Sequence, residues 1–276
     1  MSKSIFLLLF CCLLPAGCGR VLPKTDVPCI NPEIVFTEED RSDLRGTVMD
    51  LEIIARGSHY YGWIYLPEEY NPDNEKQQLP VLYFLSGMRY ADTAFQNYDR
   101  AGILDDFLSS EERGPFIYAA LPCLDFSTDF EDVFIHHILP LTQENFHASS
   151  RRNKNGLAGI SSGGDLAFRM FFKYPGRFSV LGQHSAAFTK DDLKKWDMNL
   201  KSRRGLKKDS FRFDVGEQDP LIDVYTLLRP ILDTDGAVYE YYTSPGSHSA
   251  FYWQEHFPEY INWYSRRLNR SARLIE

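Results

Sequence analysis

Apolar and polar positions follow two alternating patterns along this chain, one typical of strands and one typical of helices. Segments 47–55 and 60–67 mix apolar and polar residues on either side of a turn at Gly57, which predicts an antiparallel hairpin. Segments 79–87 and 116–122 are nearly continuous apolar runs, as expected of strands that are covered by helices on both faces. The first half of the chain therefore predicts a hairpin followed by buried strands.

The same alternation continues to the end of the chain. A proline at position 140 is expected to kink one of the predicted helices, because proline lacks the N–H that a helix needs. Strands and helices that alternate in this way predict an α/β fold, with a mostly parallel, twisted sheet, helices on both of its faces and an antiparallel hairpin at its N-terminal side. Further strands are expected at 155–160, 178–185, 210–216 and 237–244, and helices at 93–110, 130–146, 164–174 and 249–268.

The N-terminus has the pattern of an export signal. An apolar run from Ile5 to Leu14 is too short to span a bilayer and is followed by small residues. The pair Ala16-Gly17 directly before Cys18 resembles a bacterial lipoprotein box, with Cys18 as the lipidated residue. Such lipoprotein boxes usually have leucine three residues before the cysteine, and Pro15 stands there, so ordinary signal cleavage stays open. We expect a protein exported to the bacterial cell envelope, anchored to a membrane by lipid.

The chain divides into four predicted parts. Residues 1–17 form the signal peptide, 18–44 a polar tether and lead-in, 45–270 the catalytic domain, and 271–276 a tail. The 276 residues are enough for one large domain with a sizeable core. Two further cysteines outside the signal, Cys29 and Cys123, could pair in an oxidising compartment, but the sequence does not decide this.

Composition excludes several classes of function. Hydrophobic residues make up 43% of the chain and aromatic residues 14%, which is typical of a globular protein. The net charge of −8 argues against a nucleic-acid partner, because the phosphates would be repelled. No cysteine or histidine spacing predicts a metal site, since the adjacent His136 and His137 point in different directions on a helix. No dinucleotide or phosphate-binding pattern predicts a cofactor.

A glycine-rich turn at 159–164, "GISSGG", is the strongest chemical candidate. Gly159, Ser161 and Gly163 form the pattern G-x-S-x-G between a predicted strand and a predicted helix. A serine on such a turn is held in a strained conformation with its hydroxyl exposed, and the glycines allow strand and helix to approach. The frame favours Ser161 over Ser162, which would need glycine at position 160. The motif alone is not specific, and a purely structural turn is the alternative.

An acid and a histidine follow in the order that such a serine requires. Asp219 comes directly after the strand 210–216, and His248 follows the strand 237–244. Asp214, within a strand, and Glu217, in a turn, are rival acids that we rank lower. Parallel strands place their carboxyl ends at one edge of the sheet, so these side chains are expected near Ser161. The remaining histidines have ordinary structural positions: His59, His147, His184 and His256.

The predicted chemistry needs each of these residues. A serine hydroxyl is a weak nucleophile, so the imidazole of His248 must accept its proton, and Asp219 must orient that imidazole. The negative charge of a tetrahedral intermediate needs N–H donors. We expect them from the backbone of Ser162, directly after the nucleophile, and of Met88, in the loop after the strand 79–87.

These motifs together resemble the esterase D branch of the α/β-hydrolase superfamily. This branch includes S-formylglutathione hydrolases, feruloyl and acetyl-xylan esterases, enterobactin esterases and mycolyltransferases. The similarity extends from about Gly46 to Leu268 and rests on "IYLPEEY", "LPVLYFLSGM", "LAGISSGGDLAFRMFFKYPGRFS", "GEQD" and "GSHSAFYW". The resemblance implies an α/β-hydrolase fold, a triad of Ser161, Asp219 and His248, and oxyanion donors at Met88 and Ser162. Many members have His-Gly where this chain has Ser86-Gly87, which puts the shape of the oxyanion loop in question.

The sequence thus predicts an exported serine carboxylic-ester hydrolase that acts through an acyl-enzyme. A small-molecule or polysaccharide-linked ester is the expected substrate. An acyltransferase with the same site, or a catalytically silent lipoprotein that binds a carbohydrate or a partner, are the alternatives. Five aromatic residues are candidates for a pocket that holds an aromatic or sugar group: Tyr90, Phe126, Phe130, Tyr252 and Trp253.

Overall fold

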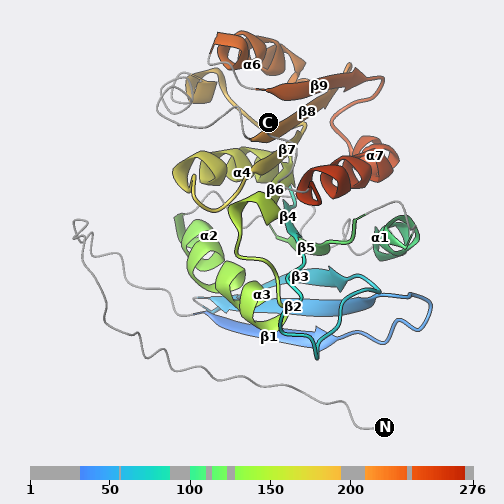
Figure 1. Ribbon diagram of the computed structural model, residues 1–276. Coiled ribbons are helices and arrows are strands. Elements are labelled where there is room, and N and C mark those ends of the chain that lie inside the picture. The colour runs from blue at the N-terminus through green and yellow to red at the C-terminus, as the bar shows by residue number, and fades with distance from the viewer. Residues whose placement is uncertain are drawn as a thin grey trace, which may run out of the picture.

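A computed structural model describes residues 32–55, 57–87, 100–109, 114–122, 128–193, 209–234 and 238–270. They form one nine-stranded sheet in the order β1-β2-β3-β5-β4-β6-β7-β8-β9 (Figure 1). The strands are β1 (Glu33–Glu38), β2 (Thr47–Ala55), β3 (Ser58–Leu66), β4 (Val81–Leu85), β5 (Ile117–Leu121), β6 (Asn155–Ile160), β7 (Val180–His184), β8 (Ser210–Gly216) and β9 (Tyr239–Ser244).

The sheet has an antiparallel part and a parallel part. Strands β1, β2, β3 and β5 pair antiparallel in that order. From β5 onward, β4, β6, β7, β8 and β9 are all parallel. The structure therefore confirms the predicted mostly parallel sheet with an antiparallel N-terminal part. Parallel pairing aligns the carboxyl ends of β6, β8 and β9, which precede the candidate nucleophile, acid and base.

Strand β1 is a part of the sheet that the sequence did not predict. It lies in the segment interpreted as a tether and lead-in, and its whole length pairs with the middle of β2, from Glu33 opposite Ile54 to Glu38 opposite Met49. Ile34 and Phe36 are only partly buried, packed against the core. This edge strand therefore has a weak apolar pattern, which is why the sequence did not reveal it.

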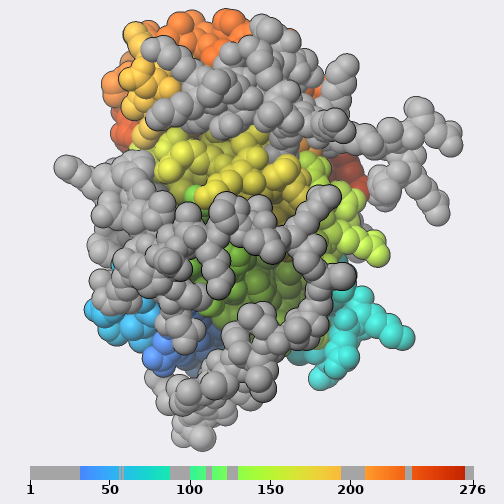
Figure 2. All heavy atoms as spheres, turned by 90° about the vertical axis from the view of Figure 1, so that its left-hand side faces the viewer, coloured from blue at the N-terminus to red at the C-terminus, as the bar shows by residue number. Residues whose placement is uncertain are grey.

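Helices cover both faces of the sheet, as Figure 1 shows. Helices α1 and α7 pack on one face, where their buried side chains form one cluster with Phe84 and Tyr118 of the sheet. The other helices pack on the opposite face, which Figure 2 views directly, with the green-to-yellow atoms of α2, α3 and α4 in the middle. The helices are α1 (Arg100–Leu108), α2 (Thr128–Val133), α3 (Leu139–Asn145), α4 (Ser162–Lys173), α6 (Ile222–Thr234) and α7 (Ala250–Leu268).

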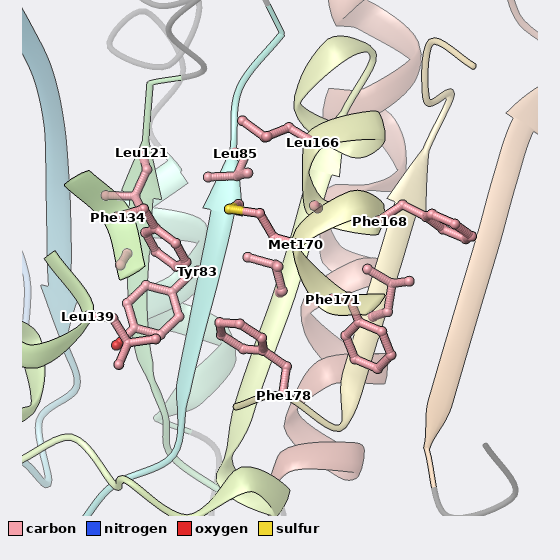
Figure 3. Packing of buried hydrophobic residues seen from close by; sticks show 14 of the residues in the cluster. Tyr83, Leu85, Leu121, Phe134, Leu139, Leu166, Phe168, Met170, Phe171 and Phe178 are labelled. Atoms are coloured by element: carbon pink, nitrogen blue, oxygen red, sulfur yellow. The ribbon is translucent and has the colours of Figure 1, made fainter. Parts of the chain in front are cut away.

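The core between the sheet and this second group of helices is close-packed and aromatic. Figure 3 shows Tyr83 of β4 between Phe134 and Phe178, whose rings lie 5.1 and 6.4 Å from its own. Met170 of α4 lies beside them, facing the sheet. Burying one such side chain contributes about 1.5–3 kcal/mol. This packing fixes α4, and with it the turn that precedes α4, against the sheet.

Two helical regions differ from the sequence prediction. The helix expected over 130–146 consists of α2, a π-helical turn (Phe134–Ile138) and α3. Pro140 lies in the first turn of α3 and cannot donate the backbone hydrogen bond of a continuous α-helix, which explains a change of helix type just before it. Helix α6 was not predicted; it buries Leu228 and Leu232 although Pro230 lies inside it.

Among the helices of the described residues, none combines the length and the apolar composition needed to cross a bilayer. The described part of the chain also contains no cluster of three or more His, Cys, Asp or Glu side chains able to hold a metal ion.

Candidate active site

The turn between β6 and α4 holds Ser161 in a strained backbone conformation. Its φ of 53° and ψ of −123° lie in a region that residues with a side chain rarely adopt. The glycines of the motif are required by close contacts. A Cβ at Gly159 would lie 2.3 Å from the backbone of Gly163, and one at Gly163 would lie 2.4 Å from the carbonyl oxygen of Leu85. The serine therefore stands on a turn that only this pattern of small residues permits.

The structure brings the three residues of the predicted triad together. His248 Nε2 lies 3.0 Å from Ser161 Oγ, and His248 Nδ1 lies 2.8 Å from Asp219 Oδ2. The side chain of Asp219 is buried, whereas that of His248 is 27% exposed. With its proton on Nδ1, the imidazole of His248 would donate to the carboxylate from Nδ1 and accept from the serine hydroxyl at Nε2. The three side chains thus form one hydrogen-bonded chain that runs from the buried Asp219 through the partly exposed His248 to Ser161.

Hydrogen bonds keep the carboxylate of Asp219 ionised. Burial alone would raise the pKa of Asp219, but the hydrogen bonds that it accepts from His248 and from the backbone N–H of Leu221 outweigh burial and lower that pKa. The ring of Trp253 packs edge-on against the imidazole of His248, with 4.9 Å between ring centroids. A charged acceptor on one side and a buried ring on another leave the imidazole little rotational freedom.

The oxyanion donors are described only in part. Ser162 is the first residue of α4, so its backbone N–H points out of the N-terminal end of a twelve-residue helix, where the helix dipole favours negative charge. Met88 lies outside the described residues. Gly87, directly before it, lies next to the nucleophile: a Cβ there would be 3.2 Å from Ser161 Cβ. The loop after β4 therefore does approach the serine.

The other candidates fall elsewhere. Asp214 hydrogen-bonds to His184, a buried partner that was not predicted, and Glu217 is exposed. Of the five aromatic residues considered for a pocket, Phe130, Tyr252 and Trp253 are at most 2% exposed and belong to the packed interior, which corrects that interpretation for them. The remaining candidates lie outside the described residues: Tyr90, Phe126, Cys18, Cys29 and Cys123.

The fold and this constellation define a class, the serine hydrolases with an α/β-hydrolase fold. Comparison with known families agrees: a family model described as "Putative esterase" matches residues 55–264. The chain therefore belongs to this esterase family, and its enzyme class is that of a carboxylesterase. This confirms the family and the enzyme class that the sequence predicted.

Solved structures share the fold at low sequence identity. A ferulic acid esterase is 17% identical, with a TM-score of 0.64, and the match covers 85% of this chain and 98% of that one. The S-formylglutathione hydrolase of Staphylococcus aureus is 17% identical (TM-score 0.59, covering 85% and 99%). The feruloyl esterase module of Clostridium thermocellum, solved as a serine-to-alanine mutant with sinapinate, is 14% identical (TM-score 0.68, covering 86% and 94%).

Proposed function

We propose that the chain is an exported serine carboxylic-ester hydrolase in which Ser161 is the nucleophile, His248 the general base and Asp219 the residue that orients the base. The observation that carries this proposal is the continuous hydrogen-bonded chain from Ser161 Oγ through His248 to Asp219. A neutral imidazole 3.0 Å from the hydroxyl is within reach of its proton.

In the proposed reaction, Ser161 Oγ attacks the ester carbonyl carbon while His248 Nε2 takes the hydroxyl proton. The negative charge then falls on the former carbonyl oxygen, where the backbone N–H groups of Ser162 and Met88 donate to it. The intermediate collapses, the C–O bond to the alcohol breaks, and His248 returns the proton to the departing alcohol oxygen. Water then attacks the acyl carbon while His248 takes a proton from it. The bond from that carbon to Ser161 Oγ breaks, His248 returns the proton to Ser161 Oγ, and the acid leaves.

The substrate class proposed from the family is that of carboxylic esters. Feruloyl esterases and S-formylglutathione hydrolases share this fold, and the proposed export of the chain favours an ester outside the cytosol, a small acyl or carbohydrate-linked one. We propose to screen acetyl, feruloyl and longer acyl esters, with S-formylglutathione as the cytosolic comparison. Product analysis with added sugar or glycerol acceptors separates hydrolysis from acyl transfer.

Labelling with a fluorophosphonate followed by intact-mass measurement tests the nucleophile. Wild type and Ser162→Ala should each take up one adduct, and Ser161→Ala none. Ser162→Ala is the matched control because it removes the neighbouring hydroxyl and keeps the backbone N–H. Ester turnover in Ser161→Ala should fall by about 10⁶-fold. An adduct on folded Ser161→Ala would refute the assignment, and an unlabelled, folded wild type would refute the proposed function.

The proposed lipid anchor rests on the apolar run Ile5–Leu14 and on Cys18 directly after Ala16-Gly17. Expression in a bacterium with an alkynyl fatty acid tests it. The mature protein should carry the label, and Cys18→Ser should lose it. A processed but unlabelled wild type would mean ordinary signal cleavage instead, and the anchor would be rejected while export would stand.

A further inference from the structure

A second pair of a histidine and an aspartate lies beside the nucleophile, and this pair is fully buried. His184 Nδ1 is 2.5 Å from Asp214 Oδ1, and His184 Nε2 is 2.8 Å from Tyr264 Oη. Tyr260 Oη donates to Asp214 Oδ2 at 2.6 Å, and the ring of Tyr260 stacks on the imidazole with 3.7 Å between centroids. All four side chains are buried. We call these four residues the His184 network.

The protonation states in the His184 network follow from its burial. Burial lowers the pKa of His184 and outweighs the opposing effect of Asp214, so the imidazole is neutral near pH 7. Burial also raises the pKa of Tyr260 and of Tyr264 far above the ordinary value, so both hydroxyls keep their protons. A neutral imidazole can then donate from Nδ1 to Asp214 and accept from Tyr264 at Nε2. Each polar atom of the imidazole has its partner.

The backbone of His184 contacts the nucleophile directly. The N–H of Ser161 donates to the carbonyl oxygen of His184 at 3.1 Å, and the N–H of Ala187 donates to the carbonyl oxygen of Ser161 at 2.8 Å. The short segment 184–187 therefore holds both backbone groups of Ser161, whose φ of 53° is strained. Strain of this kind costs about 1–3 kcal/mol and persists only where the surrounding structure enforces it.

The other members lie on the elements that lead to the base and the acid. Asp214 is on β8, which runs into the loop of Asp219. Tyr260 and Tyr264 are on α7, which begins just after His248. The His184 network thus joins, through buried hydrogen bonds, the three parts of the chain that carry the proposed triad.

Strand β7 is shaped to admit one of these hydrogen bonds. A Cβ at Gly182 would lie 1.5 Å from Tyr264 Oη, so only glycine at that position lets the hydroxyl reach His184. Glycine weakens the interior of a strand, and apolar side chains of similar volume often stabilise a core as well as a buried polar pair does. Stability alone is therefore a poor explanation for this arrangement.

We propose that the His184 network is a positioning device for the reaction: His184 and its partners hold the backbone of Ser161 in register with His248. This inference rests on the proposed function. His184, Asp214, Tyr260 and Tyr264 do not touch the reacting atoms, and they act through the segment 184–187 and the elements β8 and α7.

The test compares His184→Leu and His184→Asn with a control on the same sheet. Asparagine can keep a donor toward Asp214, whereas leucine cannot. Asn155→Ala is the control, because the buried amide of Asn155 donates to the carbonyl oxygens of Ser149 and Arg151 at the opposite end of β6. For each variant we would measure kcat and KM on an ester that wild type hydrolyses, the rate of fluorophosphonate labelling, and the free energy of unfolding in urea.

We expect His184→Leu to lower kcat and the labelling rate by about tenfold to a hundredfold, the range that small misplacements of reacting groups produce. KM should stay within about twofold of wild type, because the substrate contacts are unchanged. His184→Asn should recover most of the lost rate. Asn155→Ala should destabilise the fold and leave kcat unchanged. Equal kcat in folded His184→Leu and Asn155→Ala would overturn the proposal.

If His184→Leu does not fold, Tyr260→Phe with Tyr264→Phe replaces it, since this double variant removes two hydroxyls and keeps both rings. Slower labelling than in Asn155→Ala supports the proposal, and equal labelling overturns it. Failure of the proposed function looks different. Wild type itself would then be unreactive, whereas failure of this inference alone leaves wild type and His184→Leu equally reactive.

Discussion

The two His–Asp pairs of this chain have the same chemical groups and different surroundings. His248 and Asp219 bond at 2.8 Å, and His184 and Asp214 at 2.5 Å. The imidazole of His248 is 27% exposed, and its second nitrogen faces the hydroxyl of Ser161. The imidazole of His184 is 0% exposed, and its second nitrogen faces a tyrosine inside the core.

The difference shows that the role of a His–Asp pair depends on what the second imidazole nitrogen, Nε2, faces. An imidazole that must accept and return a proton needs a substrate within reach and needs to tolerate a positive charge. His248 meets both conditions, with a carboxylate behind it and an accessible side in front. His184 is enclosed, so its hydrogen bonds can only hold other groups in place.

Among the changes that compare the two pairs, the largest effect is expected from exchanging the two carboxylates one at a time for amides. Asp219→Asn should lower kcat by about 10⁴-fold, because the amide no longer holds the correct tautomer or stabilises the imidazolium. Asp214→Asn should lower kcat only about tenfold, through misplacement of Ser161. Its main effect should be a loss of about 1–3 kcal/mol in unfolding free energy, because it weakens two buried hydrogen bonds. Steady-state kinetics and urea unfolding check both. Equal kcat losses would erase the distinction between the pairs.

A methyl group added beside Ser161 sharpens the contrast between the two pairs. Gly87→Ala places a methyl group 3.2 Å from Ser161 Cβ and 3.8 Å from Ser161 Oγ. We expect kcat/KM to fall by about tenfold to a hundredfold with the proton-transfer residues intact. Gly176→Ala is the matched control, since nothing lies within 4 Å of its added carbon. Similar activity in the two variants would show that a methyl group at this position does not disturb Ser161.

The enclosed pair should be visible in the pH dependence of stability. Burial lowers the pKa of His184 below 6.5, with a smaller contribution from Arg212 and an opposing one from Asp214. In the unfolded chain the pKa of this histidine is about 6.5, and in the native state it is lower. Between these two values the unfolded chain binds a proton that the native state does not, so the free energy of unfolding must rise with pH. The contribution of His184 to stability is fully present above pH 6.5 and is lost as the pH falls toward the lowered pKa of the native state. One such group contributes a slope of at most about 1.4 kcal/mol per pH unit.

Urea unfolding from about pH 5 to about pH 8, compared between wild type and His184→Asn, measures that slope. The variant should show a shallower dependence below pH 6.5, because it lacks the titrating ring. Parallel curves would mean that the pKa of His184 is the same in the native and the unfolded state.

The smallest effect is expected at the outer edge of the His184 network. Arg212, which lies beside Asp214, also pairs with Glu259 at 3.3 Å, but the side chain of Glu259 is 65% exposed. Water screens the exposed carboxylate of Glu259, so Glu259→Gln should change unfolding free energy by no more than about 0.5 kcal/mol and leave kcat unchanged. A change as large as that of Asp214→Asn would show that the network depends on its surface partner.

Much of this picture could be predicted from the sequence because it rests on local patterns. Nearly continuous apolar runs predicted the buried strands β4 and β5, and the pattern of Gly159, Ser161 and Gly163 predicted the turn after β6. The edge strand β1 was missed because a partly exposed strand has a weak apolar pattern, and the helix α6 was missed although Leu228 and Leu232 have helical spacing, because Pro230 is unfavourable inside a helix. Asp214 was ranked as a rival acid because position along a strand does not reveal which histidine a carboxylate faces.

The sequence by itself determined the class of fold, the esterase family and the order of serine, acid and base, because each of these is encoded in short segments. Only the tertiary structure decided that His184 forms an enclosed pair with Asp214 while His248 stays accessible. That choice depends on contacts between residues far apart in the chain, such as Tyr264 reaching His184 over Gly182. Burial and access to solvent arise when the sheet and α7 come together, and they separate two otherwise identical pairs into one suited to proton transfer and one suited to support.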